Sequence, residues 1–294
     1  MNRLSNIRLM LLAAFMLLSF NGYSQNSSLP FQSGEKAKII IHYKCGTKAD
    51  IGSVDLSLDQ KSDGAGKPYF DLRANIATFK FWDNFYKVRD SYVSNFYVNG
   101  LTPVKASRNV NEGDYWARNQ YVWSNGGKTL HAIVDKSTRP HRDTTFTESS
   151  VIRDLFNVIF TCRAQDINRM MAGKVARYIL AMDKDLIDLR LKYVGRENKK
   201  LGDFGTFKTI KLAVSVNALH PGQVDATGTK FSVSIDNAAT DDNVFHGEGK
   251  IFIWLTDDDN HLPVFFTAPV IVGSINGRLA SCSGLKYPLS SKIE

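Results

Sequence analysis

The 294-residue sequence lacks the short motifs by which many cofactor-dependent enzymes are recognised. It contains no GxxxxGK[ST] or GxGxxG segment, which argues against a phosphate-binding loop and against a dinucleotide-binding fold. It also contains no GxSxG nucleophile elbow and no HExxH zinc motif, and its six histidines are scattered singly. We therefore expect no cofactor and no metal site, and we favour a binding function over a catalytic one.

Cysteine is scarce, because Cys45, Cys162 and Cys282 are the only three in the chain and none of them forms a CxxC pair. This pattern excludes a cysteine-ligated zinc site and allows at most one disulfide within the chain. Cys45 and Cys282 lie in strand-like segments toward opposite ends of the sequence, and they could meet if the terminal strands pair. The alternative is that the cysteines are small buried thiols.

Long apolar runs are absent after residue 24, which excludes a polytopic helical membrane protein. Residues 1–24 predict a secretory signal peptide, because Arg3 and Arg8 precede an apolar run at 9–20 that small and polar residues follow. That run spans only about 18 Å as a helix, too little for an uncleaved membrane anchor. We expect residues 25–294 to form one exported, soluble, β-rich domain.

Alternation of apolar and polar residues dominates the rest of the chain. It is clear over residues 54–59, 70–76, 187–193 and 210–216, and it places the apolar side chains of each segment on one face of a strand. Two hairpins are predicted, one joining 115–123 to 128–134 through Ser124-Asn125-Gly126-Gly127, the other joining 250–255 to 262–267. The sequence therefore predicts antiparallel sheet in both halves of the domain.

One long helix is predicted at about residues 149–164. Its apolar residues form a single stripe that includes Val151, Ile152 and Leu155, and the Thr145 and Glu148 spacing just upstream is typical of a capping box. The predicted fold is all-β: a strongly curved antiparallel sheet or open β-barrel with this central helix packed on it. A two-layer β-sandwich is the alternative.

Several short segments, taken in order, resemble a known family. They are Gly34-Glu35-Lys36, the run from Phe85 to Tyr92, Leu101-Thr102-Pro103, the helix ending at Cys162-Arg163, the run from Leu191 to Glu197, the run from Ile253 to Asp258, Leu262-Pro263-Val264 and Val272-Gly273-Ser274. This order is similar to that of the bacterial envelope family called domain of unknown function 3108 (DUF3108), over about residues 34–280. The resemblance implies a β-rich periplasmic or outer-membrane-associated protein of unassigned activity, and it supplies no catalytic residues.

A cavity between helix and sheet is the first candidate site. Residues 79–123 form the stretch of the chain that is richest in aromatic side chains. These side chains either fill the core of the sheet or form a surface that binds sugar rings or acyl chains. The net charge is +8 for the whole chain and +6 without Arg3 and Arg8 of the signal peptide, and this surplus favours anionic lipids or acidic glycans. We expect a noncatalytic cell-envelope module that binds an amphipathic ligand (lipid, glycolipid or glycan). Its candidate ligand-binding residues are Trp82, Tyr86, Arg89, Tyr92 and Arg163.

Other interpretations of these residues remain open. Arg89 with Asp90, and Arg163, are embedded in apolar sequence and could form buried ion pairs that fix the helix to the sheet. A structural or assembly protein of the outer membrane, with an envelope protein as its partner, is a second function. A hydrolase is a third, and it would use the region of Asp257, Asp258 and His261, which otherwise forms an acidic turn. Nucleic acid is not expected as a partner of an exported protein.

Overall fold

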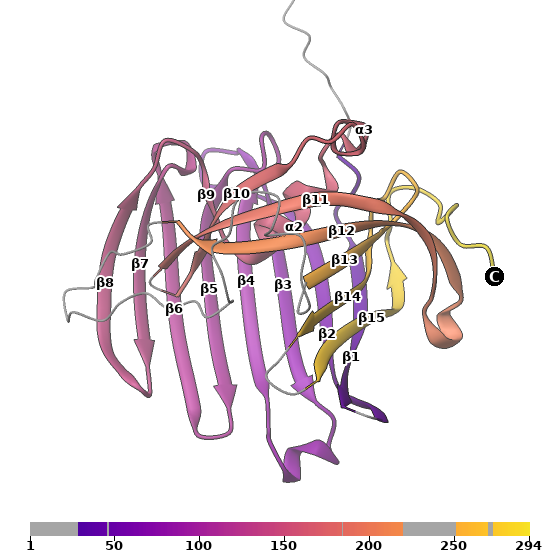
Figure 1. Cartoon of the computed structure of the whole chain (residues 1–294). Coiled ribbons are helices and arrows are strands. Elements are labelled where there is room, and N and C mark those ends of the chain that lie inside the picture. The colour runs from indigo at the N-terminus through magenta and orange to yellow at the C-terminus, as the bar shows by residue number, and fades with distance from the viewer. Residues whose placement is uncertain (1–28, 46, 184, 220–250, 270–272) are drawn as a thin grey trace, which may run out of the picture.

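The computed structural model describes residues 29–45, 47–183, 185–219, 251–269 and 273–294, so the predicted signal peptide lies outside the described residues. Within these residues the chain forms one sheet of fifteen strands, with β8 at one edge and β9 at the other. Two runs of sequentially paired strands, β1–β8 and β9–β15, are joined by antiparallel pairing of β1 with β15, and we call them the two meanders. Every strand pair is antiparallel except β9 with β10, which is parallel. Figure 1 shows that the sheet curls strongly without closing.

The strands have the following bounds. The first meander consists of Glu35–Cys45 (β1), Thr47–Ser62 (β2), Pro68–Thr78 (β3), Arg89–Tyr97 (β4), Pro103–Glu112 (β5), Tyr115–Ser124 (β6), Thr129–Lys136 (β7) and Arg139–Thr147 (β8). The second consists of Ile152–Arg153 (β9), Ala176–Met182 (β10), Asp185–Lys200 (β11), Thr206–Ala218 (β12), Ile251–Thr256 (β13), Pro263–Pro269 (β14) and Ser274–Ser283 (β15). The predicted all-β class with one curved sheet is confirmed, and the sheet is continuous rather than a two-layer sandwich.

The two predicted hairpins are both present. Strands β6 and β7 pair up to Ser124 and Thr129, and the turn between them contains the short 3-10 helix η2 (Asn125–Gly127). Asn125 has φ of 51° and Gly126 has φ of 65°, the left-handed values that an Asn-Gly turn is selected for. Strands β13 and β14 form the second hairpin, with Trp254 opposite Phe265.

The helices are shorter than predicted. Helix α2 spans Leu155–Arg163 and α3 spans Ile167–Met171, so the expected start at residue 149 is wrong. Asp154 is the N-cap, because its carboxylate accepts hydrogen bonds from the first free backbone N–H groups of α2, while Thr145 lies within β8. Ile152 is extended in β9 and pairs with β10. No helix in the described part of the chain is long and apolar enough to cross a membrane.

Helix α2 lies inside the curled sheet and packs on both meanders (Figure 1). Its Phe156 and Phe160 join a cluster with Leu72 and Phe96 of the first meander. Its Val158 joins a second cluster, formed by β10–β13. Burying these faces removes apolar surface from water at about 25 cal/mol per Å², so α2 holds the two meanders together.

The terminal strands pair as the disulfide hypothesis required, but their register keeps Cys45 and Cys282 apart. Cys282 lies opposite Ala37, whereas Cys45 is at the far end of β1. Cys45 is eight residues along β1 from Ala37, a distance of about 26 Å in an extended strand. A disulfide needs the two Cα atoms within about 7 Å, so Cys45 and Cys282 are too far apart to form one. Cys45, Cys162 and Cys282 are free thiols in this structure.

Candidate functional site

An apolar cavity of about 320 Å³ lies between α2 and the concave face of the sheet. The alternation predicted from the sequence explains its lining, since on β2 the side chains of Val54, Leu56 and Leu58 face it while Asp55 and Asp59 are exposed. Strands of both meanders contribute to the wall, and α2 covers it with Leu155, Phe156, Val158, Ile159 and Phe160.

A buried ion pair forms one end of the cavity wall. Arg163, at the last position of α2, donates to Glu35 of β1 through Nη1 at 2.5 Å and Nη2 at 2.9 Å. Its Nε and Nη2 also donate to the backbone carbonyl of Asn260 at 3.2 Å. The side chains of Arg163 and Glu35 are only 1% and 4% exposed, so the interpretation of Arg163 as a buried pair that fixes helix to sheet is confirmed.

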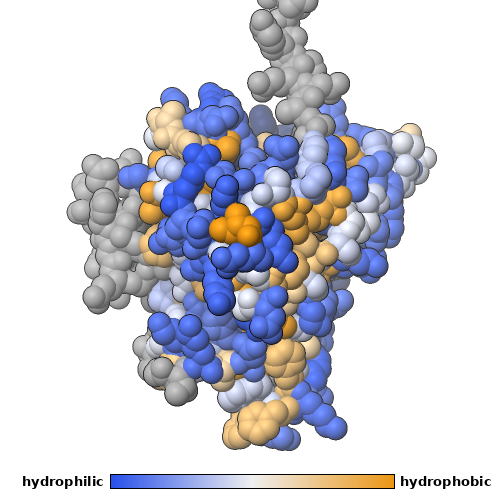
Figure 2. All heavy atoms as spheres, turned by 90° about the vertical axis from the view of Figure 1, so that its right-hand side faces the viewer, coloured by the Kyte–Doolittle hydropathy of each residue, from blue (hydrophilic) through white to orange (hydrophobic). Residues whose placement is uncertain are grey.

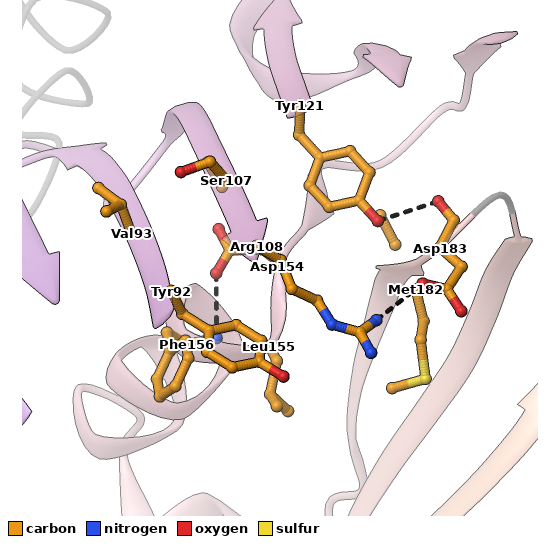
Figure 3. A pocket seen from close by; sticks show the side chains of 12 residues that line it. Tyr92, Val93, Ser107, Arg108, Tyr121, Asp154, Leu155, Phe156, Met182 and Asp183 are labelled. Atoms are coloured by element: carbon orange, nitrogen blue, oxygen red, sulfur yellow. Dashed lines mark hydrogen bonds and ion pairs between the residues drawn. The ribbon is translucent and has the colours of Figure 1, made fainter. Parts of the chain in front are cut away.

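A smaller pocket of about 170 Å³ adjoins the apolar cavity and shares Leu155 and Phe156 with it (Figure 3). Most of its wall is apolar as well, and we call it the polar pocket for the charged groups of Arg108, Asp154 and Asp183 that line it. Arg108 of β5 reaches across this polar pocket to Asp183, which lies in the turn between β10 and β11, with Nη1 to Oδ1 at 2.7 Å. The hydroxyl of Tyr121 donates to the Asp183 carbonyl at 2.9 Å. The N-terminal end of α2 therefore separates an apolar space from a polar one.

The polar pocket contains charged groups of both signs. Burial opposes ionisation of Asp183, but hydrogen bonds from Lys136 and Asn119 outweigh it and hold the pKa of this carboxyl below its usual range. Arg108 and Lys136 both pair with the carboxylate of Asp183, and Asp154 is a second carboxyl in the pocket wall. The Nε–H of Arg108 is buried without an acceptor among the described residues. At the pocket floor, burial raises the pKa of Asp154.

The five predicted ligand-binding residues lie in different places. Arg163 lines the apolar cavity, and Tyr92 lines the polar pocket, where the Arg108 guanidinium is 5.8 Å from its ring centroid. Trp82 and Tyr86 instead lie in the connection between β3 and β4, and Arg89 is the first residue of β4; all three are absent from the walls of both spaces.

Arg89 does not form the buried pair considered for it. It is exposed and binds Asp83 at 2.5 Å, whereas the buried Asp90 accepts a hydrogen bond from the backbone N–H of Asn111. Adjacent residues of a strand point to opposite faces, so Arg89 and Asp90 cannot both face the interior from β4. A ligand-binding role for Trp82, Tyr86 and Arg89 stays a prediction.

The acidic turn between β13 and β14 makes structural contacts. Asp257 binds Arg196, with Oδ2 at 2.7 Å from Nε. Asp258 accepts hydrogen bonds from the backbone N–H of Asn260 at 3.0 Å and the hydroxyl of Ser291 at 2.6 Å, which ties down the C-terminal segment. The Nδ1 of His261 is 3.0 Å from the carbonyl of Arg163. The three proposed hydrolase residues thus have separate partners.

Sequence reasoning missed the residues that give the polar pocket its charge. Arg108 and Asp183 are 75 positions apart, and Glu35 and Arg163 are 128 apart. Arg108 lies in an ordinary polar stretch of a strand, and no local pattern distinguishes it from other exposed cations. Only pairing across the curled sheet could have identified these contacts.

The family model for proteins of unknown function called DUF3108 matches residues 38–280, which is most of the chain. The chain belongs to the DUF3108 family. No curated protein matches this DUF3108 sequence.

Two solved structures are similar to the DUF3108 chain. The first is a beta-barrel-like protein of the domain of unknown function DUF1849 from Brucella abortus, with 9% identity, a TM-score of 0.48, and coverage of 86% of this chain and 98% of its own. The second is a protein from Bacteroides fragilis described as exported and as having a YmcC-like fold, with 9% identity, a TM-score of 0.34, and coverage of 87% of this chain and 98% of its own.

Proposed function

We propose that this DUF3108 protein is a noncatalytic binding module of the cell envelope that takes up an amphipathic ligand, a lipid or glycolipid. The acyl chain occupies the apolar cavity, and the head group lies in the polar pocket. The observation that carries this proposal is the apolar cavity of about 320 Å³ enclosed between α2 and both meanders. Export to the envelope is supported by the predicted signal peptide.

The size and lining of the cavity suit a hydrocarbon chain. Ligand sites in proteins commonly measure about 300–1,000 Å³, and this cavity is at the lower end of that range. An apolar wall offers water few hydrogen-bond partners, and each methylene group transferred there from water contributes about 0.8 kcal/mol. A single acyl chain is therefore a better occupant than water.

The polar pocket suits an anionic head group. The buried Nε–H of Arg108 has no acceptor among the described residues, and a guanidinium binds carboxylate or phosphate oxygens well. Arg108 is the cation in the wall of the pocket, so an anionic head group that enters would bind beside its guanidinium. Leu155 and Phe156 border both spaces, so the acyl chain and the head group of one ligand would lie on either side of these two side chains.

Native mass spectrometry of the delipidated protein tests this proposal. We expect palmitic acid or phosphatidylglycerol to bind the wild type, and Val54→Phe/Val214→Phe to abolish uptake, because these valines enter the cavity from β2 and β12. The matched control is Val122→Phe/Val194→Phe, which adds the same rings at side chains that are 55% and 50% exposed.

Uptake by the control and loss in the cavity variant support the proposal. If the folded wild type takes up neither probe, or if the cavity variant binds as well as the control does, the proposed function is wrong. Far-UV circular dichroism establishes that each variant keeps the β-sheet fold before binding is measured.

A further inference from the structure

The connection between β3 and β4 exposes a cluster of aromatic side chains. Phe81 is 64% exposed, Phe85 is 72% and Tyr86 is 52%, and with the half-buried Trp82 we call them the aromatic tip. Figure 1 shows this connection extending below the neighbouring turns at the same end of the sheet. In Figure 2 the same lowest part of the molecule carries orange side chains beside blue ones. The aromatic tip therefore protrudes.

The aromatic tip is held in one shape by its own contacts. The rings of Phe81 and Trp82 are 5.2 Å apart between centroids, and Phe85 is 5.6 Å from Phe81 and 5.9 Å from Trp82. The short 3-10 helix η1 (Trp82–Asn84) places them, and the indole Nε1 donates to the carbonyl of Asp50 at 2.8 Å. The exposed rings are thus presented by an ordered turn.

Charges of both signs lie near the aromatic tip, with Glu112 and Asp90 close to Tyr86 and cations on the connection itself. Asp83 is neutralised by Arg89 at 2.5 Å and also accepts a hydrogen bond from Thr78. Lys80 and Lys87, one on each side of the tip, are both exposed and form no salt bridge within the described part of the chain. The connection therefore combines three exposed aromatic rings with two exposed lysines that form no salt bridge among the described residues.

We propose that the aromatic tip docks the protein on the surface of an anionic lipid bilayer. Aromatic rings are favoured at the boundary between acyl chains and head groups, and lysines near that surface are attracted to anionic lipids. A narrow protruding tip can enter a bilayer interface, whereas a protein partner is more often met by a broader patch with a packed centre. This docking does not depend on the apolar cavity and goes beyond the proposed function.

Flotation with phospholipid vesicles tests the docking. We expect the full chain without residues 1–24 to bind vesicles of mixed phosphatidylcholine and phosphatidylglycerol, and to bind pure phosphatidylcholine more weakly. Replacing both Phe81 and Phe85 by Ser should weaken binding by roughly a hundredfold, since each aromatic ring buried in the bilayer interface contributes roughly a tenfold factor in affinity. Lys80→Glu/Lys87→Glu should weaken binding to the anionic vesicles only, and added salt should do the same to the wild type.

The matched control is Val122→Thr/Val194→Thr, which removes two exposed apolar side chains elsewhere in the sheet and should leave vesicle binding unchanged. The cavity variant Val54→Phe/Val214→Phe should also still bind vesicles, so failure of the docking and failure of ligand uptake can be told apart. Wild-type protein that floats with neither vesicle, as expected if the tip contacts a protein instead, overturns the proposal. Equal binding by the Phe81→Ser/Phe85→Ser variant overturns it as well.

Discussion

The ion pair between Arg163 and Glu35 provides the sharpest prediction about stability. We consider Arg163→Met, which keeps much of the volume of the side chain and removes its charge and all its hydrogen bonds. The Glu35 carboxylate, 4% exposed, would then remain in the interior without its two donors. The carbonyl of Asn260 would lose its donor as well.

The expected loss is large because only one partner of a buried pair is removed. Such a change costs about 3–5 kcal/mol, mainly because an uncompensated charge stays buried. Domains are stable by about 5–15 kcal/mol, so the variant should still fold, with a melting temperature lowered on the order of 10 °C. Glu35→Met/Arg163→Met removes both charges and should regain at least about 2 kcal/mol of this loss.

Urea unfolding followed by circular dichroism measures the free energy of unfolding of the wild type, both single variants and the double variant. The four values form a double-mutant cycle that isolates the coupling between Arg163 and Glu35. Two results would refute the reasoning: a loss below about 1 kcal/mol for Arg163→Met, or a double variant whose loss equals the sum of the single losses.

Two further predictions concern the thiols and pH. Burial raises the pKa of Cys162 to about 12 and that of Cys282 to about 11, whereas Cys45 is exposed. Iodoacetamide near neutral pH should therefore modify Cys45 first, which peptide mass mapping would show. Comparable modification of Cys162 in the folded protein would contradict this. The pKa of Asp183 is lower in the folded than in the unfolded protein, so ionised Asp183 stabilises the folded state. This contribution is fully present above the pKa of the unfolded state and is lost as the pH falls through the pKa of the folded state. Asp183→Asn should therefore destabilise at neutral pH, and urea titrations should show its difference from the wild type shrinking as the pH falls through the folded pKa of Asp183; a difference that does not vary with pH would contradict this.

Local patterns predicted the strands well because each strand has one face toward the interior. Val54, Leu56 and Leu58 alternate with polar residues, and these three side chains line the apolar cavity. The start of α2 was predicted too early for a related reason. Val151 and Ile152 suit a buried strand as well as a helix, and only the pairing of Ile152 with β10 distinguishes the two.

The candidate site could be predicted only in part. The sequence indicated that a helix over a curved sheet could enclose an apolar space, and that Arg163 and Tyr92 could lie near it. It also assigned Trp82 and Tyr86 to that space, because a run of aromatic residues does not reveal which rings a turn exposes. Arg108 was missed because its partner, Asp183, is 75 residues away along the chain.

The sequence by itself determined the class of this protein: alternation along each segment makes a sheet with one apolar face, and the Asn-Gly pair makes a tight hairpin. These are short-range effects, set by residues within a few positions of one another. Only the tertiary structure decided how far the sheet curls, that space remains beneath α2, that Glu35 meets Arg163, and that the aromatic tip faces outward. Each of these depends on contacts between segments that are distant in sequence, and chain order alone does not specify which of them meet.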